Sequence, residues 1–176
     1  YKNWCKSTKR IQALPLTPAL VQAMASFCMI SGQIRLGAGL LVCFVGLLRI
    51  GELIKLRMGE INCVRNDLAV LTLLDSKGAK LKGKPEFVMI RDESIVHMLK
   101  KLKCDSCDTD PFYGGSYRDV CLGLQNAAAF FDFKHPHLTP HGLRCGGATW
   151  HFTFDLSYDR TQAHGRWQNV LNVKLY

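Results

Sequence analysis

Residues 141–150 read HGLRCGGATW. Within this stretch His141 and Arg144 stand three positions apart, and two glycines follow where a helix often carries aliphatic side chains. Pro140 directly precedes the stretch, and proline is favoured in the first turn of a helix, so a helix is predicted to begin here. The stretch therefore combines a proton-handling imidazole with a permanent cation, and its meaning depends on which other parts of the chain lie beside it.

Helices are predicted on both sides of the middle of the chain. The clearest begins after Thr17-Pro18, an N-cap residue followed by a first-turn proline, and covers residues 18–30. Apolar runs and capping residues predict further helices at 34–48, 51–56, 92–102, 116–131, from 140 onward, from about 157, and over 168–176. The apolar run at 34–48 is too short to cross a membrane, so it predicts a buried helix and no membrane partner.

The middle of the chain predicts a small sheet. Residues 61–64 (INCV), 68–74 (LAVLTLL) and 86–90 (EFVMI) are rich in strand-forming residues. A turn-like Arg-Asn-Asp at 65–67 separates the first two, and a polar, lysine-rich connection at 75–85 separates the second from the third. We therefore expect an α+β domain that is mostly helical and contains one three-stranded antiparallel sheet.

The composition restricts the partner and the compartment. The chain has 23 Lys and Arg against 14 Asp and Glu, a formal net charge of +9, which favours a polyanionic partner such as nucleic acid. Its 8 cysteines come without a secretory signal at the start of the sequence, so we expect reduced thiols and an intracellular location. The sequence contains no P-loop and no G-x-S-x-G motif, which argues against P-loop NTPases and α/β-hydrolases.

A zinc site is an alternative that the cysteines raise. Cys104 and Cys107 form a C-x-x-C pair. The histidines that follow it are His135, His137 and His141. A structural zinc site normally has a second closely spaced pair, which Cys121 and Cys145 do not form. We therefore expect no metal, and a metal-binding regulatory domain is the least favoured hypothesis.

Four segments carry side chains suited to phosphate chemistry. They are LLRIGELIKLR with Arg49 and Glu52, DSKGAK with Lys77, HGLR with His141 and Arg144, and GRWQNVLNVKLY with Trp167 and Tyr176. Each also has an ordinary interpretation: Arg49 and Glu52 fit an intrahelical ion pair, and Trp167 fits a packing residue. Lys77 directly follows a predicted strand, whereas its neighbours in the same connection are expected to bind DNA from a solvated turn. These neighbours are Lys80, Lys82 and Lys84.

Taken together, the four segments make the chain resemble the catalytic domain of the tyrosine recombinases, the integrase family of DNA-strand-transfer enzymes. Members of that family carry, in order, an arginine in a G-L-R-x-x-E segment, a hairpin lysine, an H-x-x-R motif, a histidine or tryptophan, and a nucleophilic tyrosine. The matching residues are Arg49 with Glu52, Lys77, His141 with Arg144, Trp167 and Tyr176. The resemblance extends from about residue 17 to the last residue, and Cys145 departs from it, since many relatives have a histidine or a basic residue there.

The resemblance implies DNA strand cleavage and rejoining through a 3′-phosphotyrosyl intermediate, without cofactor or metal. Arg49 and Arg144 would bind the non-bridging oxygens of a phosphodiester, because a guanidinium donates two hydrogen bonds at once and keeps its charge. The phenol of Tyr176, with an ordinary pKa near ~10, needs a cationic field and a proton acceptor, and His141 would supply the acceptor.

The other matching residues are expected to assist. Lys77 would protonate the leaving 5′ oxygen, and the indole N–H of Trp167 would hold a phosphate oxygen. Glu52 would orient an arginine. The two glycines after Cys145 would let their helix approach the duplex closely.

The resemblance also implies what surrounds this domain. Residues 1–176 correspond to one catalytic domain, without the N-terminal DNA-clamping domain of the relatives and without the segment that follows their tyrosine. The full-length protein is expected to act as a homotetramer on double-stranded DNA. Two alternatives stay open: a DNA-binding module of the same fold that no longer cuts, and an activity like that of type IB topoisomerases.

Overall fold

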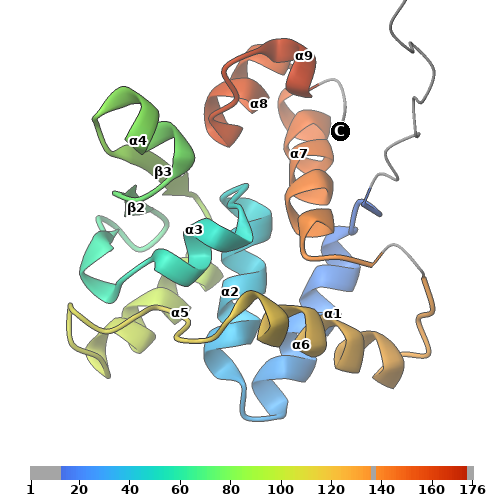
Figure 1. Ribbon diagram of the computed structural model, residues 1–176. Helices are drawn as coiled ribbons and strands as arrows, with labels where there is room; N and C mark the ends of the chain where they lie inside the picture. Colours follow the sequence, from blue (N-terminus) through green and yellow to red (C-terminus); the bar gives the residue numbers. More distant parts are fainter. Residues whose placement is uncertain (1–12, 136–137, 174–176) are drawn as a thin grey trace, which may run out of the picture.

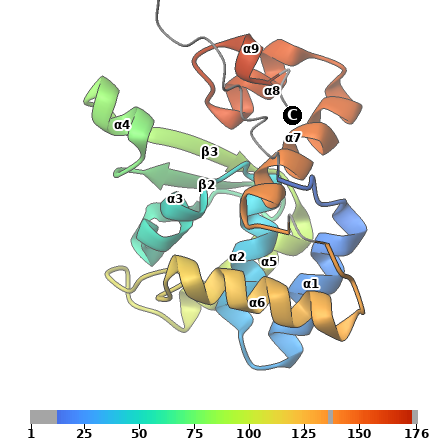
Figure 2. The same cartoon turned by 45° about the vertical axis from the view of Figure 1, so that its right-hand side comes forward.

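The computed structural model describes residues 13–135 and 138–173. In chain order its elements are α1 (Pro18–Ile30), α2 (Ile34–Val45), α3 (Ile50–Lys55), the 3-10 helix η1 (Met58–Glu60), β1 (Ile61–Cys63), β2 (Ala69–Leu73), α4 (Lys77–Lys82), β3 (Glu86–Ile90), α5 (Glu93–Cys104), α6 (Tyr117–Phe130), α7 (His141–Asp155), α8 (Tyr158–Gly165) and α9 (Val170–Val173). Figures 1 and 2 show α1, α2, α5 and α6 together in one half of the domain, with the sheet at one side and α7 to α9 above. The α+β class predicted from the sequence is confirmed.

Two helix starts follow directly from local sequence signals. The Thr17 hydroxyl accepts a hydrogen bond from the backbone N–H of Leu20 at 3.4 Å, and Pro18 occupies the first turn of α1. At α6, the Ser116 hydroxyl accepts from the backbone N–H of Asp119 at 3.3 Å, and the Asp119 carboxylate accepts from the Ser116 N–H at 2.7 Å. Both predicted starts are confirmed, because each cap needs only residues within one turn.

The predicted three-stranded antiparallel sheet is also confirmed, in the order β1-β2-β3. Ile61 pairs with Leu71, and Leu71 pairs in turn with Val88, so these three side chains share one face of the sheet. All three are buried in the core, whereas Phe87 on the opposite face is 60% exposed. This alternation is the period-2 pattern expected of a sheet that packs on one side only.

The connection between β2 and β3 was predicted as a polar loop, and that prediction is wrong. The segment forms α4, whose first turn is capped by the Ser76 hydroxyl accepting from the Ala79 N–H at 2.9 Å. Gly83 ends the helix with φ of 61°, a left-handed conformation that glycine adopts without strain. Lysine has a good helix propensity, so a lysine-rich run between a serine cap and a glycine can form a helical turn.

Helix α2 ends at Val45, three residues before the predicted end at 48. Leu47 takes a φ of 48° and the Leu48 N–H donates to the Cys43 carbonyl at 3.0 Å, which turns the chain toward α3. The last carbonyls of a helix have no partner within the helix. The early end therefore leaves the carbonyls of Val45, Gly46 and Leu47 open to donors from elsewhere in the chain.

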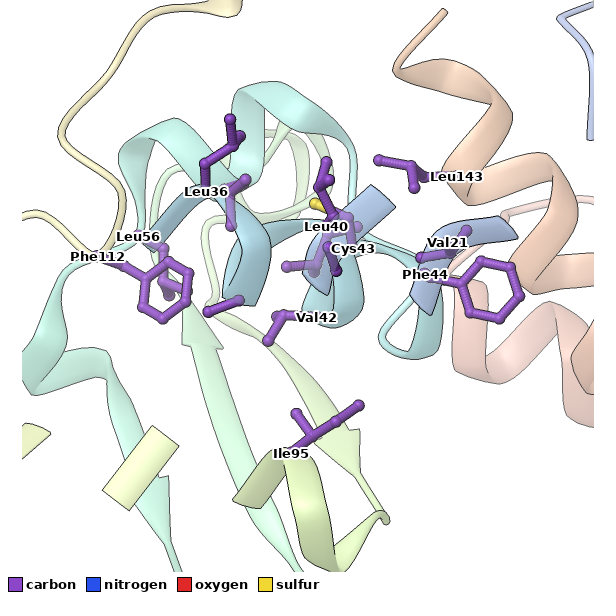
Figure 3. Packing of buried hydrophobic residues seen from close by; sticks show 14 of the residues in the cluster. Val21, Leu36, Leu40, Val42, Cys43, Phe44, Leu56, Ile95, Phe112 and Leu143 are labelled. Carbon is purple, nitrogen blue, oxygen red and sulfur yellow. The ribbon is translucent and has the colours of Figure 1, made fainter. Parts of the chain in front are cut away.

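Helix α2 is the centre of the core. Figure 3 shows its Leu36, Leu40 and Cys43 side chains among residues of other elements, including Val21 of α1 and Leu143 of α7. From Leu36 onward α2 is almost fully buried, which explains why every residue of this part of the helix is apolar. No helix within the two described ranges is long and apolar enough to cross a membrane.

The two glycines that follow Cys145 let α7 pack closely against α2 and against the segment before α1. A Cβ atom on Gly147 would collide with the carbonyl oxygen of Phe44 in α2, and one on Gly146 would collide with the carbonyl oxygen of Leu16. Both glycines are buried. The prediction that they allow close approach to DNA is therefore wrong: they allow backbone-to-backbone packing inside the domain, and this packing places the first turn of α7 beside the end of α2.

Candidate active site

The site is built around the C-terminal end of α2. Three side chains from the last third of the chain donate hydrogen bonds to the carbonyls that α2 leaves open. The bonds run from His164 Nε2 to Val45 at 2.8 Å, from Arg166 Nη1 to Gly46 at 3.3 Å, from Arg166 Nη2 to Leu47 at 3.4 Å, and from Arg144 Nη1 to Leu47. A helix C-terminus carries a partial negative charge, so two guanidinium groups at this end are electrostatically favourable.

Arg144 is the most deeply placed of these side chains. It is 1% exposed, and its Nη2 donates to the Gly165 carbonyl at 2.6 Å. The guanidinium carbon lies 4.3 Å from the centroid of the Trp167 ring, a cation–π contact. Arg144 was expected to bind the non-bridging oxygens of a phosphodiester, but Trp167 covers its guanidinium and backbone carbonyls hold it. Trp167 itself is 9% exposed and packs as its ordinary interpretation suggested.

Arg49 is the arginine that faces solvent. It caps the N-terminus of α3, and the Glu52 carboxylate accepts from its backbone N–H at 2.9 Å and from its Nη1 at 2.7 Å. The Arg49 side chain is 41% exposed, whereas the Glu52 side chain is 4% exposed. Glu52 also accepts from Arg166 Nη2 at 2.8 Å, so one buried carboxylate holds two guanidinium groups.

His141 lies at the first position of α7, next to both predicted arginines. Partial burial of its imidazole lowers its pKa, and the positive charges of Arg144 and Arg49 lower the pKa further. The ring is therefore mostly neutral at pH 7, the form that can accept a proton. Cys145, one turn later, is buried, and burial raises the pKa of its thiol to about 11, so it adds no charge to the site.

The candidate lysine, Lys77, is exposed at the first position of α4. Figure 2 shows α4 at the end of the sheet that is farther from α7. Its neighbour Lys80 forms an ion pair with Asp75 at 2.8 Å, and Lys55 contacts the same carboxylate at 2.9 Å. Hydrogen bonds from Lys80 and Lys55 lower the pKa of Asp75 to about 2. Lys84 is exposed, and the side chain of Lys82 lies outside the described part of the structure.

Three residues of the site, His164, Arg166 and Glu86, were missed in the sequence. The Arg166 side chain, 6% exposed, lies between the carboxylates of Glu52 and Glu86, with its Nε 3.7 Å from Glu86. Burial lowers the pKa of Arg166, and the two carboxylates act in the opposite direction. The one available signal was its place directly before Trp167. Glu86 gave none, because it stood at the start of a predicted strand, where a charged residue is usually exposed.

Other predicted residues are outside this cluster. Tyr176 and His137 lie outside the described residues. Cys104 and Cys107 are exposed free thiols. Within residues 13–135 and 138–173, no three His, Cys, Asp or Glu side chains are placed to hold a metal ion together.

The lowered pKa values of three histidines predict that stability depends on pH. Burial is the first cause that lowers the pKa of His141, His151 and His164, and the rings of His151 and His164 stack with centroids 4.6 Å apart. A lowered pKa in the folded state means that the unfolded chain binds more protons as the pH falls below ~6.5. We expect these histidines not to reduce the free energy of unfolding above that pH. Below it, the free energy of unfolding should decrease as the pH falls through the folded-state pKa values. Urea unfolding at pH 7.5 and 5.5 would measure this.

A matched pair of variants tests the source of that pH dependence. His164→Gln should flatten the profile, because it removes one buried titrating ring, whereas His97→Gln on the exposed surface of α5 should leave it unchanged. A profile equally steep in both variants would mean that His164 does not contribute.

Comparison with known proteins identifies the fold of this chain. No family model matches the sequence, and no curated protein is significantly similar to it. Among solved structures, the XerH site-specific recombinase bound to difH substrate superimposes with a TM-score of 0.72 at 16% identity, over 97% of this chain and 52% of that chain. The catalytic domain of bacteriophage HP1 integrase superimposes with a TM-score of 0.65 at 15% identity, over 94% of this chain and 87% of that chain. The chain has the catalytic-domain fold of the tyrosine recombinases.

The recombinase fold extends over nearly the whole chain. XerA recombinase matches 97% of it with a TM-score of 0.71 at 17% identity. This chain spans about half of the XerH chain, 52%, and 61% of the XerA chain. Several of the similar structures contain DNA, among them XerH in its pre-cleavage complex and the Tn1549 transposon integrase with transposon right-end DNA. The recombinase fold predicted from six scattered residues is confirmed; the roles of those residues stay predictions.

Proposed function

We propose that the protein cleaves and rejoins double-stranded DNA in site-specific recombination, through a 3′-phosphotyrosyl intermediate formed on Tyr176. The observation that supports this most is the gathering of Arg49, His141, Arg144 and Trp167 at the end of α2. These residues come from three distant parts of the sequence, and the fold that gathers them is that of the recombinases. The net charge of +9 also supports double-stranded DNA as the partner, because DNA is a polyanion.

The arginines divide the work of binding the scissile phosphate. Arg49 contacts the non-bridging oxygens, because its guanidinium is exposed and Glu52 fixes its direction. Arg144 acts through its buried charge. Solvent screens this charge only weakly, so it stabilises the negative charge of the phosphate more strongly than an exposed cation does. Trp167 keeps the Arg144 guanidinium in place through their cation–π contact.

The cleavage step needs a proton acceptor and a proton donor. The Tyr176 phenol has a reference pKa near ~10, and neutral His141 accepts its proton as the phenolic oxygen attacks phosphorus. The bond from phosphorus to the 5′ oxygen breaks, and that oxygen takes a proton from the Lys77 ammonium. The phosphotyrosyl bond keeps the energy of the broken phosphodiester, so rejoining requires no ATP.

The rest of the assignment also follows from the resemblance. Residues 1–176 form the catalytic part, the full-length protein acts as a homotetramer on duplex DNA, and no metal or cofactor takes part. The protein acts inside the cell, in the compartment that contains its DNA. A non-cutting DNA-binding module of the same fold and a topoisomerase-like activity are the two competing outcomes of the test that follows.

Covalent trapping tests this function, with a control that the sequence itself provides. The substrate is a nicked duplex carrying the recognition sequence, obtained by selecting bound fragments from random DNA; loss of the short 5′ fragment lets the adduct accumulate. Arg49→Ala should lower the rate of adduct formation about 10²–10³-fold, the usual effect of removing one transition-state donor. Arg57→Ala should leave the rate unchanged, because Arg57 begins the same Arg-x-x-Glu capping arrangement at η1 but donates to the Thr109 carbonyl on the surface.

The outcomes separate the three hypotheses. Equal loss in Arg49→Ala and Arg57→Ala would count against Arg49 as a phosphate ligand. Specific DNA binding by the parent without any adduct would favour the non-cutting module. An adduct combined with relaxation of supercoiled DNA that lacks the recognition sequence would favour the topoisomerase-like activity.

A further inference from the structure

A chain of buried polar side chains connects β3 to the arginines of the site. Glu86, the first residue of β3, has a side chain 7% exposed and lies 3.7 Å from Arg166 Nε. Arg166 in turn donates to Glu52 at 2.8 Å, and both of those side chains are also almost fully buried. Taking three charges out of water is unfavourable unless they are well paired, so the arrangement is weak evidence for stability and better evidence for fixing positions.

The other end of this chain of side chains holds the helix that begins with Lys77. The Ser76 hydroxyl donates to Glu86 Oε2 at 2.8 Å and accepts from the Ala79 N–H at 2.9 Å, so Glu86 fixes the residue that caps α4. A Cβ atom on Gly78 would collide with Glu86 Oε1, so only glycine lets the first turn of α4 approach this carboxylate. The backbone of Lys77, between Ser76 and Gly78, is therefore placed against Glu86 on both sides.

At the opposite end the same side chains reach Arg49. Glu52 accepts from Arg166 through Oε2 and from Arg49 Nη1 through Oε1, at 2.8 Å and 2.7 Å. Arg166 is itself fixed by the carbonyls of Gly46 and Leu47, in the turn that follows α2. Four side chains, Ser76, Glu86, Arg166 and Glu52, thus link the start of α4 to Arg49 through three hydrogen bonds and, between Glu86 and Arg166, one ion pair at 3.7 Å.

We infer that Glu86 and Arg166 are positioning residues that set the place of Lys77 relative to Arg49. In its catalytic part this inference rests on the proposed function, in which Arg49 holds the phosphate while the Lys77 ammonium protonates the leaving 5′ oxygen. Both groups must act on the same phosphodiester, although Arg49 lies at the N-cap of α3 and Lys77 at the start of α4, at the far end of the sheet. A proton donor displaced by about an ångström loses much of its effect, so a fixed path between the two is the device that such a site requires.

The inference is tested with two scissile linkages. The first substrate has the natural 5′ oxygen as leaving group, and the second has a 5′ bridging sulfur, which leaves as a thiolate. A thiol has a pKa near ~8.5, far below that of an alcohol, so its departure does not need the lysine proton. Glu86→Gln, which removes the charge and keeps the shape, should slow adduct formation on the oxygen substrate at least about tenfold, with less than about a twofold effect on the sulfur substrate.

Two controls sharpen that comparison. Arg49→Ala should slow both substrates, because it acts on the phosphate and not on the leaving group. Glu93→Gln should slow neither, since Glu93 is exposed in the first turn of α5. Equal slowing of the oxygen and sulfur substrates by Glu86→Gln would overturn the inference, because a general structural defect affects both alike.

A second measurement does not depend on catalysis. In the DNA-free protein, amide hydrogen exchange over residues 77–84 should become faster in Glu86→Gln and in Arg166→Met, and stay unchanged in Glu93→Gln. Unchanged exchange in both of the first two variants would overturn the inference. If the parent forms no adduct with either substrate, the proposed function fails, while faster exchange in the two variants would still support the role of Glu86 and Arg166 in placing α4.

Discussion

The Tyr176→Phe protein is expected to bind duplex DNA as tightly as the parent and to form no covalent adduct with it. The substitution removes one hydroxyl group, which is the proposed nucleophile, and leaves every cation of the site in place. Phosphate contacts by those cations dominate affinity for DNA, so the salt dependence of binding should also be unchanged. This is the largest effect expected of any single substitution, since no other described group in the site is a good substitute for the phenol.

Denaturing gel electrophoresis of the nicked recognition duplex measures this directly. The parent should give a slowly migrating, protease-sensitive band attached through the 3′ phosphate, and Tyr176→Phe should give none. Tyr158→Phe, in the first turn of α8, serves as the matched control and should trap DNA like the parent. Adduct formation by Tyr176→Phe at the parental rate would assign the nucleophile to another residue. The proposed role of Tyr176 would then be wrong, and only the similarity of fold to the recombinases would remain.

The second large effect concerns stability. Glu52→Ala should lower the free energy of unfolding by about 3–5 kcal/mol, because it leaves the buried Arg166 guanidinium without its closest carboxylate. Glu60→Ala is the matched control: Glu60 accepts from the Arg57 N–H at 2.9 Å, as Glu52 does from Arg49 at the same distance, but it has no buried arginine beside it. Loss of a helix cap alone costs about 1 kcal/mol.

Urea unfolding of the two variants distinguishes the ion pair from the cap. A difference of several kcal/mol between Glu52→Ala and Glu60→Ala would show that the buried carboxylate neutralises Arg166. Similar losses in both would mean that Glu52 matters only as a capping residue. The double variant Glu52→Ala with Arg166→Met should recover part of the lost stability, because the charge that lacked a partner is also removed.

The sequence predicted the features that depend on neighbouring residues. Thr17 and Ser116 cap their helices through bonds that span three residues, and the alternation in β2 and β3 follows from the pleat of a strand. The α4 helix was missed although Ser76 and Gly83 are typical start and stop signals, because the lysines and glycines between them favoured a turn. The early end of α2 was missed although Gly46 occupies its C-cap position, because Leu47 and Leu48 continue the apolar run.

The site was predicted in part, for a similar reason. Arg49, His141 and Arg144 lie in short motifs with a fixed spacing, so their presence could be read from the sequence. Arg166 and Glu86 pair across 80 residues, and neither belongs to a motif. The burial of Arg144 was also hidden, because its partners are the carbonyls of Leu47, in the turn after α2, and of Gly165 in α8, which only the folded chain brings near it.

The bonds at the end of α2 determine when the site can form. His164 and Arg166 reach the carbonyls of residues 45 and 46 across 119 and 120 positions of sequence. Such long loops close only after the segments between them have begun to collapse, since the entropy of closure must be offset by contacts already made. During synthesis, α1 to α6 emerge first and leave these carbonyls hydrated until the last part of the domain appears. A nascent or locally unfolded chain therefore lacks the assembled arginine cluster, and the proposed cleavage activity should appear only with the final folding step.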